Sequence, residues 1–467
     1  MFASCDNCNL KVHFVGIGGI GMSGIAEILH SLGYLVQGSD KVDSQNVKRL
    51  EKLGIKTFIG HEAKNVDGAS VIVYSSAIKS DNPELLRAKE LFIPRLSRAE
   101  MLSQVVRFKK SVVVAGSHGK TTVTSLCAAV LEMAGLDPTV INGGIINSYS
   151  TNAKLGTGDW AVIESDESDG SFLHFFPTIG VITNIDNEHL TYHGTLDNLK
   201  NAFKIFLNNL PFYGVGIVCI DDENTADVVG NSTDRRIITY SIENHSMFKA
   251  ENIRQTDSGT TFDVWYGGRK VDDIFIPLFG KHNVKNALAA IAMSNEFKIN
   301  IETIKSTLAT FSGVNRRFTT IGTIGATLAV DDYAHHPTEI SALLDAAHQR
   351  VAGKVLLIFQ PHRFTRLNLL FEDFCKCFGT ADKIIILPVY KADDSESGKV
   401  TSKDLFEQLK LQNKDVLIAS DEVELELILK STLANQAFTS DDIILFAGAG
   451  NISKWGHDIV AKIGNHV

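Results

Sequence analysis

Short apolar runs alternate with helical patterns along most of the chain. Each run ends in a turn rich in glycine or polar residues, and an amphipathic segment follows it. This order is typical of parallel sheets covered by helices, so the pattern predicts an α/β fold throughout. The expected strands are residues 11–15, 34–37, 71–74, 111–115, 160–163, 180–183, 327–330, 354–359, 383–389 and 442–446.

The length of 467 residues is too great for one hydrophobic core and indicates about three domains. We place them at residues 1–107, 108–312 and 313–467. The net charge of −9 and the lack of a densely basic segment argue against nucleic acid or an anionic membrane as a partner. No apolar run is long enough to span a membrane, and the first residues do not resemble a signal peptide, so we expect a cytoplasmic protein.

Cysteine use does not indicate a disulfide framework, because six cysteines are few for a chain of this length. Cys5 and Cys8 have the spacing of metal ligands, but a tetrahedral zinc site needs two more. We therefore expect reduced thiols.

A glycine-rich loop follows the first expected strand and opens a helix. Its sequence, Gly16-Ile17-Gly18-Gly19-Ile20-Gly21, fits G-x-G-x-x-G, in which free N–H groups and a helix N-terminus bind a diphosphate. Asp40, after the next strand, can accept hydrogen bonds from a ribose. Other residues placed to line the same crevice are Met22, Ser23, His61, Ser75 and Ser76. The motif alone leaves the diphosphate ester open, and a turn used only for packing is the alternative.

A second phosphate loop follows the strand at 111–115. It comprises Gly116, Ser117, His118, Gly119, Lys120, Thr121 and Thr122. Backbone N–H groups of such a loop surround phosphates, Lys120 reaches the outer ones, and the Thr121 hydroxyl can bind Mg²⁺. The loop is two residues shorter than the common P-loop pattern, yet its chemistry predicts a triphosphate site.

Acidic residues follow the next expected strand. Glu164, directly after the strand, is best placed as a magnesium ligand. For Asp166, Glu167 and Asp169 we favour a solvated loop. His189 follows a neighbouring strand, where it can bind metal or serve as an ordinary polar residue.

Further polar clusters lie near the second boundary and beyond it. Asn283 can cap a helix, or it can bind a nucleobase together with His282 and Asn286. The later clusters, at the ends of expected strands, suit carboxylate or phosphate binding. They are Arg316, Arg317, Asp332, Tyr333, His335, His362, Arg363 and Arg366.

Taken together and in order, these segments resemble the Mur ligases of peptidoglycan synthesis, and among them the alanine-adding branch. The resemblance spans almost the whole chain. It departs from the family at 391–394, where the family more often has a Gly-Glu pair, and at Asn451, where aspartate is commoner. The segments that carry it are 16–22, 116–122, 164–169, 183–189, 280–286, 313–318, 331–339 and 360–366.

The resemblance implies an N-terminal Rossmann-like domain for UDP-N-acetylmuramate, a central P-loop-type ATPase domain with a mostly parallel sheet, and a C-terminal Rossmann-like domain that closes over ATP and brings L-alanine. It implies catalysis of an acyl-phosphate ligation, with roles in cell-wall synthesis, cell shape and division. Mg²⁺, or Mn²⁺, would bind Thr121, Glu164 and His189. Lys120, His189, His335, Arg363 and Arg366 would be catalytic, Arg317 and Asp332 would contact ATP, and Tyr333 and His362 would contact the amino acid.

Three alternatives remain at this point. A nicotinamide-dependent oxidoreductase would use 16–40 as a dinucleotide site, but it leaves the second phosphate loop unexplained. A nucleotide sensor would bind ATP without turnover. A recycling ligase would add a preformed murein peptide in place of alanine. The sequence leaves a monomer and a homodimer equally open.

Overall fold

The computed structural model describes residues 10–464 except 76, 108, 150, 231–233, 393, 395–399, 413 and 436–437. Ser76, Cys5 and Cys8 from the sequence predictions lie outside the described residues. The chain forms two compact units. The first comprises Met1–Asn252, Phe262–Ile274 and Lys285–Ser312, and the second comprises Ile253–Thr261, Phe275–Val284 and Gly313–Val467.

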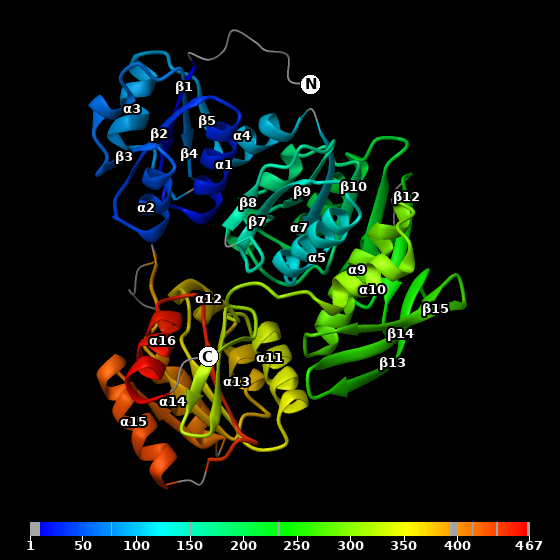
Figure 1. The fold of residues 1–467 in the computed structure, drawn as a ribbon. Coiled ribbons are helices and arrows are strands. Elements are labelled where there is room, and N and C mark those ends of the chain that lie inside the picture. Colours follow the sequence, from blue (N-terminus) through cyan, green and yellow to red (C-terminus); the bar gives the residue numbers. More distant parts are fainter. Residues whose placement is uncertain are drawn as a thin grey trace. The chain divides into compact units, whose positions relative to one another are not determined.

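The first unit begins with a five-stranded parallel sheet in the order β3-β2-β1-β4-β5 (Figure 1). Its strands are β1 (Lys11–Val15), β2 (Leu35–Asp40), β3 (Lys56–Ile59), β4 (Val71–Tyr74) and β5 (Arg95–Ser97). The helical segments between and after them are α1 (Ile20–Ser31), α2 (Gln45–Lys52), η1 (Ala63–Val66), α3 (Pro83–Glu90) and α4 (Arg98–Val106).

Strand β2 runs three residues further than the sequence pattern predicts. Gly38 and Ser39 look like turn residues, but both are buried in the sheet. A Cβ at Gly38 would lie 2.6 Å from the Phe14 carbonyl oxygen and from the Ile17 side chain. The glycine therefore allows the glycine-rich loop at 16–21, called the diphosphate loop from here on, to pack directly on the strand.

A ten-stranded sheet follows, in the order β15-β14-β13-β12-β11-β10-β6-β9-β7-β8. The pairs from β12 through β7 are parallel, and β7 pairs with β8 in the antiparallel direction. The strands are β6 (Lys110–Ala115), β7 (Thr139–Ile146), β8 (Thr151–Lys154), β9 (Trp160–Glu164), β10 (Ile179–Ile182), β11 (Val215–Cys219), β12 (Arg236–Ser241), β13 (Phe248–Thr256), β14 (Gly259–Tyr266) and β15 (Arg269–Ile276). The helical segments are α5 (Lys120–Met133), η2 (Ser171–His174), α6 (Leu190–His193), α7 (Leu196–Asn208), α8 (Glu223–Gly230), α9 (Lys281–Glu296) and α10 (Ile301–Ala309).

Helix α1 of the first sheet packs closely on β8 of the second. A Cβ at Gly24 would lie 2.8 Å from the Ala153 Cβ and 3.1 Å from the Asn152 amide nitrogen. Arg49 adds a polar tie, since it donates to the Thr151 hydroxyl at 2.7 Å. One hydrophobic cluster includes residues from both sheets. The two glycine-rich loops, at 16–21 and 116–122, therefore belong to one packed body.

The second unit contains a six-stranded sheet in the order β16-β17-β21-β18-β19-β20, in which only the β16–β17 pair is antiparallel. Helices α11, α13 and α14 contribute to the core on one face, and α15 and α16 contribute to the core on the other. The strands are β16 (Thr319–Ile324), β17 (Thr327–Asp332), β18 (Val355–Phe359), β19 (Lys383–Ile386), β20 (Val416–Ile418) and β21 (Ile443–Ala447). The helices are α11 (Pro337–Arg350), α12 (Phe364–Leu369), α13 (Phe371–Cys377), α14 (Ser402–Leu411), α15 (Glu422–Asn435) and α16 (Ile452–Ile463).

The structure confirms the α/β prediction and places a strand at each expected position. The first and third expected strands have the predicted bounds, and the others shift mostly by one or two residues at an end. Within the described part of the chain, no helix combines the length and the apolar character that crossing a membrane requires.

The aromatic core of the central sheet supplies a stability test. Phe172 is fully buried, with ring centroids of Phe203 and Phe206 at 4.9 and 5.6 Å. We expect Phe172→Ala to lower the free energy of unfolding by about 3–5 kcal/mol, because it leaves a cavity. Phe212→Ala is the matched control: this side chain is 93% exposed, and we expect a change within about 0.5 kcal/mol. Denaturant unfolding of both variants measures the difference, and equal effects would contradict the packing described.

Candidate functional site

The diphosphate loop is held by the end of β2. The Ser39 carbonyl accepts hydrogen bonds from the N–H groups of Gly16 at 2.8 Å and Ile17 at 2.9 Å. The Gly18 N–H donates to the Asp40 carboxylate at 2.8 Å. A Cβ at Gly18 would lie 2.9 Å from that carboxylate, so a larger residue there would force the carboxylate to move. The loop therefore has the close turn that diphosphate binding needs, with Asp40 beneath it.

The other residues predicted around this loop differ in their surroundings. Ser75 lies beside Gly16, where a Cβ would be 3.5 Å from the serine Cβ. Met22 is buried in the apolar core, and the Ser23 hydroxyl accepts a hydrogen bond from Arg49. His61 follows β3 and contacts Ser39. Ser75 and His61 thus lie at the loop, whereas the side chains of Met22 and Ser23 face protein.

Arg98 is a cation at this site that the sequence patterns did not single out. It is the first residue of α4, and its Nη1 would lie 2.9 Å from a Cβ at Gly21. Its charge also helps to lower the pKa of Asp166 in the acidic segment after β9. Arg98 therefore stands by the start of α1 and acts electrostatically on the central sheet. An isolated arginine before a helix carries no sequence signal for this role.

The P-loop backbone is fixed by the segment after β10. The Ser117 N–H donates to the Asn184 backbone carbonyl at 3.0 Å. The His118 N–H donates to the side-chain oxygen of the same asparagine at 2.8 Å. The Thr183 hydroxyl donates to the His118 carbonyl at 2.6 Å. A Cβ at Gly116 would overlap that hydroxyl at 2.1 Å. The strand end next to the loop therefore sets the loop's shape.

Lys120 forms a buried ion pair with Glu167. Its ammonium group lies 2.8 and 3.0 Å from the two carboxylate oxygens, and it also donates to the carbonyls of Gly116 and Ser117. Burial alone would lower the pKa of Lys120, but Glu167 and Asp166 outweigh it and raise the pKa above its usual value. The lysine is therefore charged at neutral pH.

The prediction of a solvated acidic loop is wrong for Glu167, which is fully buried. Asp166 is half-buried, and Lys120 lowers its pKa although burial opposes this. The sequence pattern could not show that this loop turns back onto the P-loop lysine, because that contact depends on the pairing of β6 with β9.

Glu164 and Thr121 face each other across the same edge of the sheet. The Thr121 hydroxyl donates to the Glu164 carboxylate at 3.1 Å, and the Gly143 N–H donates to its other oxygen at 2.6 Å. Asn142 donates to the Ser125 hydroxyl at 2.8 Å and so ties β7 to helix α5. The hydroxyl and the carboxylate form a hard oxygen donor pair that fits Mg²⁺.

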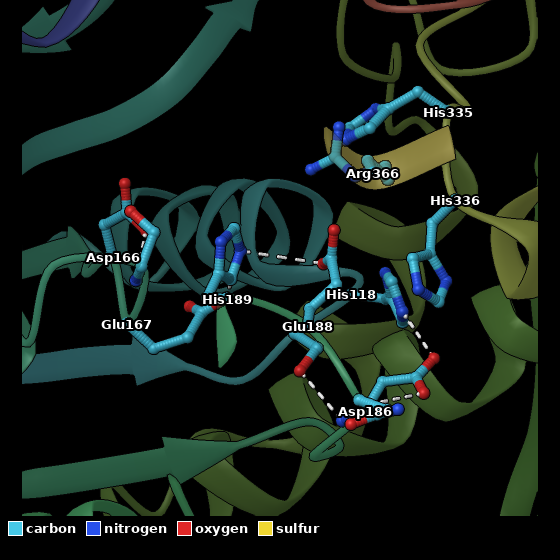
Figure 2. Close-up of polar contacts among 12 residues, drawn as sticks. His118, Asp166, Glu167, Asp186, Glu188, His189, His335, His336 and Arg366 are labelled. Atoms are coloured by element: carbon cyan, nitrogen blue, oxygen red, sulfur yellow. Dashed lines mark hydrogen bonds and ion pairs between the residues drawn. The ribbon is translucent and has the colours of Figure 1, made fainter. Parts of the chain in front are cut away.

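A second group of possible metal ligands lies beside the ion pair. The ligand atoms of Glu167, Glu188 and His189 all lie within 4.8 Å of one another. Figure 2 shows these side chains together, with His189 Nε2 at 3.4 Å from Glu167 and 3.6 Å from Glu188. His189 has a positive φ of 58°. Burial lowers its pKa, but both carboxylates outweigh burial and raise it. This donor set fits a divalent cation.

His118 belongs to the P-loop, and Asn286 borders it. His118 Nε2 lies 2.9 Å from the Asp186 carboxylate (Figure 2). The Asn286 side chain approaches Gly119 closely, and a Cβ there would lie 2.6 Å from its oxygen. Asn283 does not precede helix α9 as a cap: it lies inside the first turn and donates to the Phe279 carbonyl at 2.7 Å. The capping alternative is therefore wrong.

In the second unit, two arginines enclose Tyr333. The guanidinium carbons of Arg316 and Arg317 lie 4.7 and 5.3 Å from the centre of its ring. Arg316 also donates to the Gly448 carbonyl and lies 3.8 Å from buried Asp331. These contacts fix the cations at the carboxyl end of β17.

Asp332, the last residue of β17, is nearly buried and accepts from the N–H groups of Phe318 and Ala334, each at 2.7 Å. Burial raises its pKa to about 6, although Arg317 opposes this shift. The His335 ring lies 2.8 Å from the Tyr333 carbonyl and 5.8 Å, centroid to centroid, from His362. Asp332 thus shapes the turn that carries Tyr333 and His335.

His362 stacks on Tyr390 and is surrounded by cationic side chains, which are those of Arg316, Arg363 and Arg366. Burial, with the charges of His335 and Arg366, lowers its pKa to about 3, so the ring is neutral. Arg366 lies 3.4 Å from its Nδ1 and can only donate, which leaves the ring proton on Nε2. Arg363, with a positive φ of 67°, bonds through its N–H to the Tyr390 carbonyl. The cluster therefore consists of donors suited to a carboxylate.

The predicted residues form three groups. The diphosphate loop with Asp40, His61 and Ser75 forms the first. The P-loop with Glu164 and His189 forms the second, to which the structure adds Glu167 and Glu188. The third group lies in the second unit and comprises Arg316, Arg317, Asp332, Tyr333, His335, His362, Arg363 and Arg366. His282 and Asn283 also belong to the second unit.

Three family models match successive parts of the chain. They are the Mur ligase family catalytic domain at residues 11–110, the Mur ligase middle domain at 114–294 and the Mur ligase glutamate ligase domain at 316–450. Together they cover nearly all of the strands and helices that carry the three groups of site residues.

Curated relatives and solved structures agree with these models. The chain is 48% identical to a UDP-N-acetylmuramate–L-alanine ligase of Chelativorans over 97% of this chain and 98% of the relative. It is 47% identical to the UDP-N-acetylmuramate–L-alanine ligase of Phenylobacterium zucineum, and the match covers 97% of this chain and 95% of that relative. The UDP-N-acetylmuramate–alanine ligase of Thermotoga maritima has a TM-score of 0.83 at 30% identity, covering 97% of this chain and 99% of that structure. A murein peptide ligase of Psychrobacter arcticus shares the fold, with a TM-score of 0.72 at 24% identity over 98% and 99%. The chain therefore belongs to the Mur ligase family.

Proposed function

We propose that this chain joins L-alanine to the carboxylate of UDP-N-acetylmuramate and converts ATP to ADP and phosphate. The observation that carries this proposal is the 48% identity to an L-alanine ligase along 97% of the chain, because all three groups of site residues lie within that match. It favours alanine addition over murein-peptide recycling. A nicotinamide-dependent oxidoreductase would not need the P-loop and its acidic partners.

The diphosphate loop and the P-loop divide the two nucleotides between them. The positive end of helix α1 suits the UDP diphosphate, and Asp40 provides an acceptor for a ribose hydroxyl. Lys120 and the start of α5 suit the ATP phosphates. Asn286 beside Gly119 is a candidate contact of ATP. We place the reaction in the cytoplasm, where ATP is available.

Thr121, Glu164 and His189 would hold Mg²⁺ or Mn²⁺, and Glu167 and Glu188 are further donors nearby. When bound, the cation neutralises charge on the phosphate oxygens. Lys120 keeps a full positive charge at neutral pH, because the carboxylates around it raise its pKa. Positioning and charge neutralisation are the main contributions that proteins make to phosphoryl transfer.

The chemistry proceeds in two steps. A carboxylate is a poor electrophile, so its oxygen first attacks the γ-phosphorus of ATP, which gives an acyl phosphate and ADP. The alanine amine, after loss of a proton, then attacks the acyl carbon, and phosphate leaves as the amide forms. This order replaces one difficult step by two easier ones.

The cationic group of the second unit would bind the alanine carboxylate. Arg363 and Arg366 can each form two parallel hydrogen bonds with a carboxylate, and neutral His362 offers an Nε2–H donor. Tyr333 is held between two arginines and can close one side of a small pocket. Arg317 and Asp332 are proposed contacts of ATP, and His335 would stabilise the tetrahedral intermediate. In this proposal, residues 1–107 bind the UDP-sugar, residues 108–312 bind ATP, and residues 313–467 bind the amino acid.

The direct test is product formation by the purified chain with ATP, Mg²⁺ and UDP-N-acetylmuramate. We expect phosphate release that depends on both UDP-N-acetylmuramate and L-alanine, and a product whose mass equals the sum of the two less one water. A parallel reaction with the murein tripeptide should be much slower. Faster turnover with the tripeptide, or phosphate release without an acceptor, would contradict the proposal.

Lys120→Ala tests the P-loop. Loss of this cation should reduce kcat at least ~10³-fold, because a charge that stabilises the transferring phosphoryl group is removed. Lys200→Ala is the matched control, since Lys200 pairs with Asp227 on the surface and should leave kcat within about twofold. Steady-state phosphate release measures both. Near wild-type turnover of Lys120→Ala would show that this lysine does not act on ATP.

Arg366→Lys tests the amino-acid site. A lysine keeps the charge but loses the planar fork, so we expect the KM for alanine to rise roughly 10- to 100-fold, the range for hydrogen bonds to a charged group. The KM for ATP should change less than about twofold. Arg350→Lys, on helix α11 beside Phe279, serves as the control. An unchanged KM for alanine would remove Arg366 from the proposed site.

A further inference from the structure

Glu84 is a fully buried carboxylate that the proposed mechanism does not use. It is the second residue of helix α3 in the N-terminal sheet domain (Figure 1). Its oxygens accept hydrogen bonds from the Ser39 hydroxyl at 2.6 Å and the Asn65 amide at 2.7 Å, and they lie 3.3 Å from His13 Nε2. A buried charge is unfavourable unless such partners compensate for it. The protein therefore keeps a complete polar network at this position.

The ionised state of Glu84 follows from its partners. Burial alone would raise its pKa, but the hydrogen bonds from His13, Ser39 and Asn65 outweigh burial and lower it. An ionised carboxylate has no proton to donate, so each of these three contacts has one direction. Gln37 supports this arrangement. Its amide nitrogen donates one proton to the Asn65 backbone carbonyl at 2.8 Å and directs the other proton to His13 Nδ1. The His13 ring proton therefore lies on Nε2, which faces Glu84.

The direction of the Ser39 bond determines the tautomer of His61. Ser39 has one hydroxyl proton, and it points to Glu84. Its oxygen must therefore accept from His61 Nδ1, which lies at 2.9 Å. The same Nδ1 is 3.5 Å from the Glu84 carboxylate, which would repel a lone pair there. The proton of the neutral ring thus lies on Nδ1, and Nε2 is a hydrogen-bond acceptor.

His61 lies in the turn after β3, beside the end of β2. The Gly60 N–H donates to the Asp40 carbonyl at 2.8 Å, so the turn after β3 is tied to the end of β2. Ser39 holds the loop through its carbonyl and His61 through its hydroxyl. In doubly wound sheets the loop after the first strand binds the diphosphate, and the ends of the following strands contact the nucleoside. No described residue forms a hydrogen bond with His61 Nε2.

We propose that Glu84, acting through Ser39, is a positioning residue that fixes His61 Nε2 as the acceptor for the imide N3–H of the uracil ring. The inference rests on the proposed function, in which this domain holds a UDP-sugar. Uracil carries a proton at N3, whereas cytosine has a lone pair there. An acceptor at this position therefore selects uridine and rejects cytidine nucleotides.

A double-mutant cycle on UDP and CDP binding tests the proposal. Calorimetry with the full-length protein would compare wild type, Ser39→Ala, His61→Ala and the double variant. We expect Ser39→Ala to reduce the preference for UDP over CDP roughly 3- to 10-fold, the size of one ordinary hydrogen bond. In the His61→Ala background the same change should alter that preference less than about 1.5-fold, because Ser39 acts only through His61.

Glu84→Gln provides a second, nearly isosteric variant. Its amide can donate to Ser39, which frees the hydroxyl proton for His61 Nδ1 and leaves the ring proton on Nε2. We expect this variant to lose its preference for UDP, and the nitrogen NMR signals of His61 should show the exchanged tautomer. Ser70→Ala is the control, because Ser70 accepts a hydrogen bond from the Lys11 N–H elsewhere in the same domain. It should leave the UDP to CDP ratio unchanged.

Several outcomes would overturn the proposal. These are equal losses of UDP and CDP affinity in Ser39→Ala, an undiminished effect of Ser39→Ala in the His61→Ala background, and wild-type selectivity in folded Glu84→Gln. Binding is measured without alanine or ATP, so failure of the ligation assay alone would reject the proposed function and leave this inference standing. Wild-type protein that binds UDP no better than CDP would reject the inference even if ligation succeeds.

Discussion

The buried pair of Lys120 and Glu167 is the interaction on which the central site depends. The Lys120 ammonium compensates for the charge of the fully buried Glu167, and removing Lys120 would leave that carboxylate without its nearest compensating charge. Glu167 also faces His189, so one carboxylate connects the P-loop of α5 with the segment after β10. The charge that would meet the ATP phosphates is therefore preorganised by the fold.

Preorganisation extends to the backbone around this pair. The P-loop takes its shape from Thr183 and Asn184 on the neighbouring strand end, and Glu164 takes its orientation from Thr121 and the Gly143 N–H. Parallel pairing of β10, β6 and β9 is what aligns these residues, since it brings three carboxyl ends to one edge. An apolar sheet thus produces a polar edge, because buried strands fix the positions of the groups that follow them.

Much of this could be predicted from the sequence. Apolar runs located the strands, and glycine-rich sequences located both loops that open helices α1 and α5, because each depends on local residue order. The burial of Glu167, the position of Glu188 beside it and the approach of Arg98 to Gly21 could not be predicted, since they arise from strand pairing and packing between distant segments. The predicted end of β2 was wrong for the same reason. Gly38 and Ser39 are typical of turns, and their burial depends on the distant loop that covers them.

The close approach of α1 to β8 has a consequence for the substrate. A single methyl group at Gly24 would force these elements apart, so the span from the diphosphate loop to the P-loop is set when the first unit folds. Under the proposed function, this fixed span would select the sugar nucleotide by its length. A longer bridge between its phosphates and its carboxylate would carry the carboxylate past the γ-phosphate of ATP.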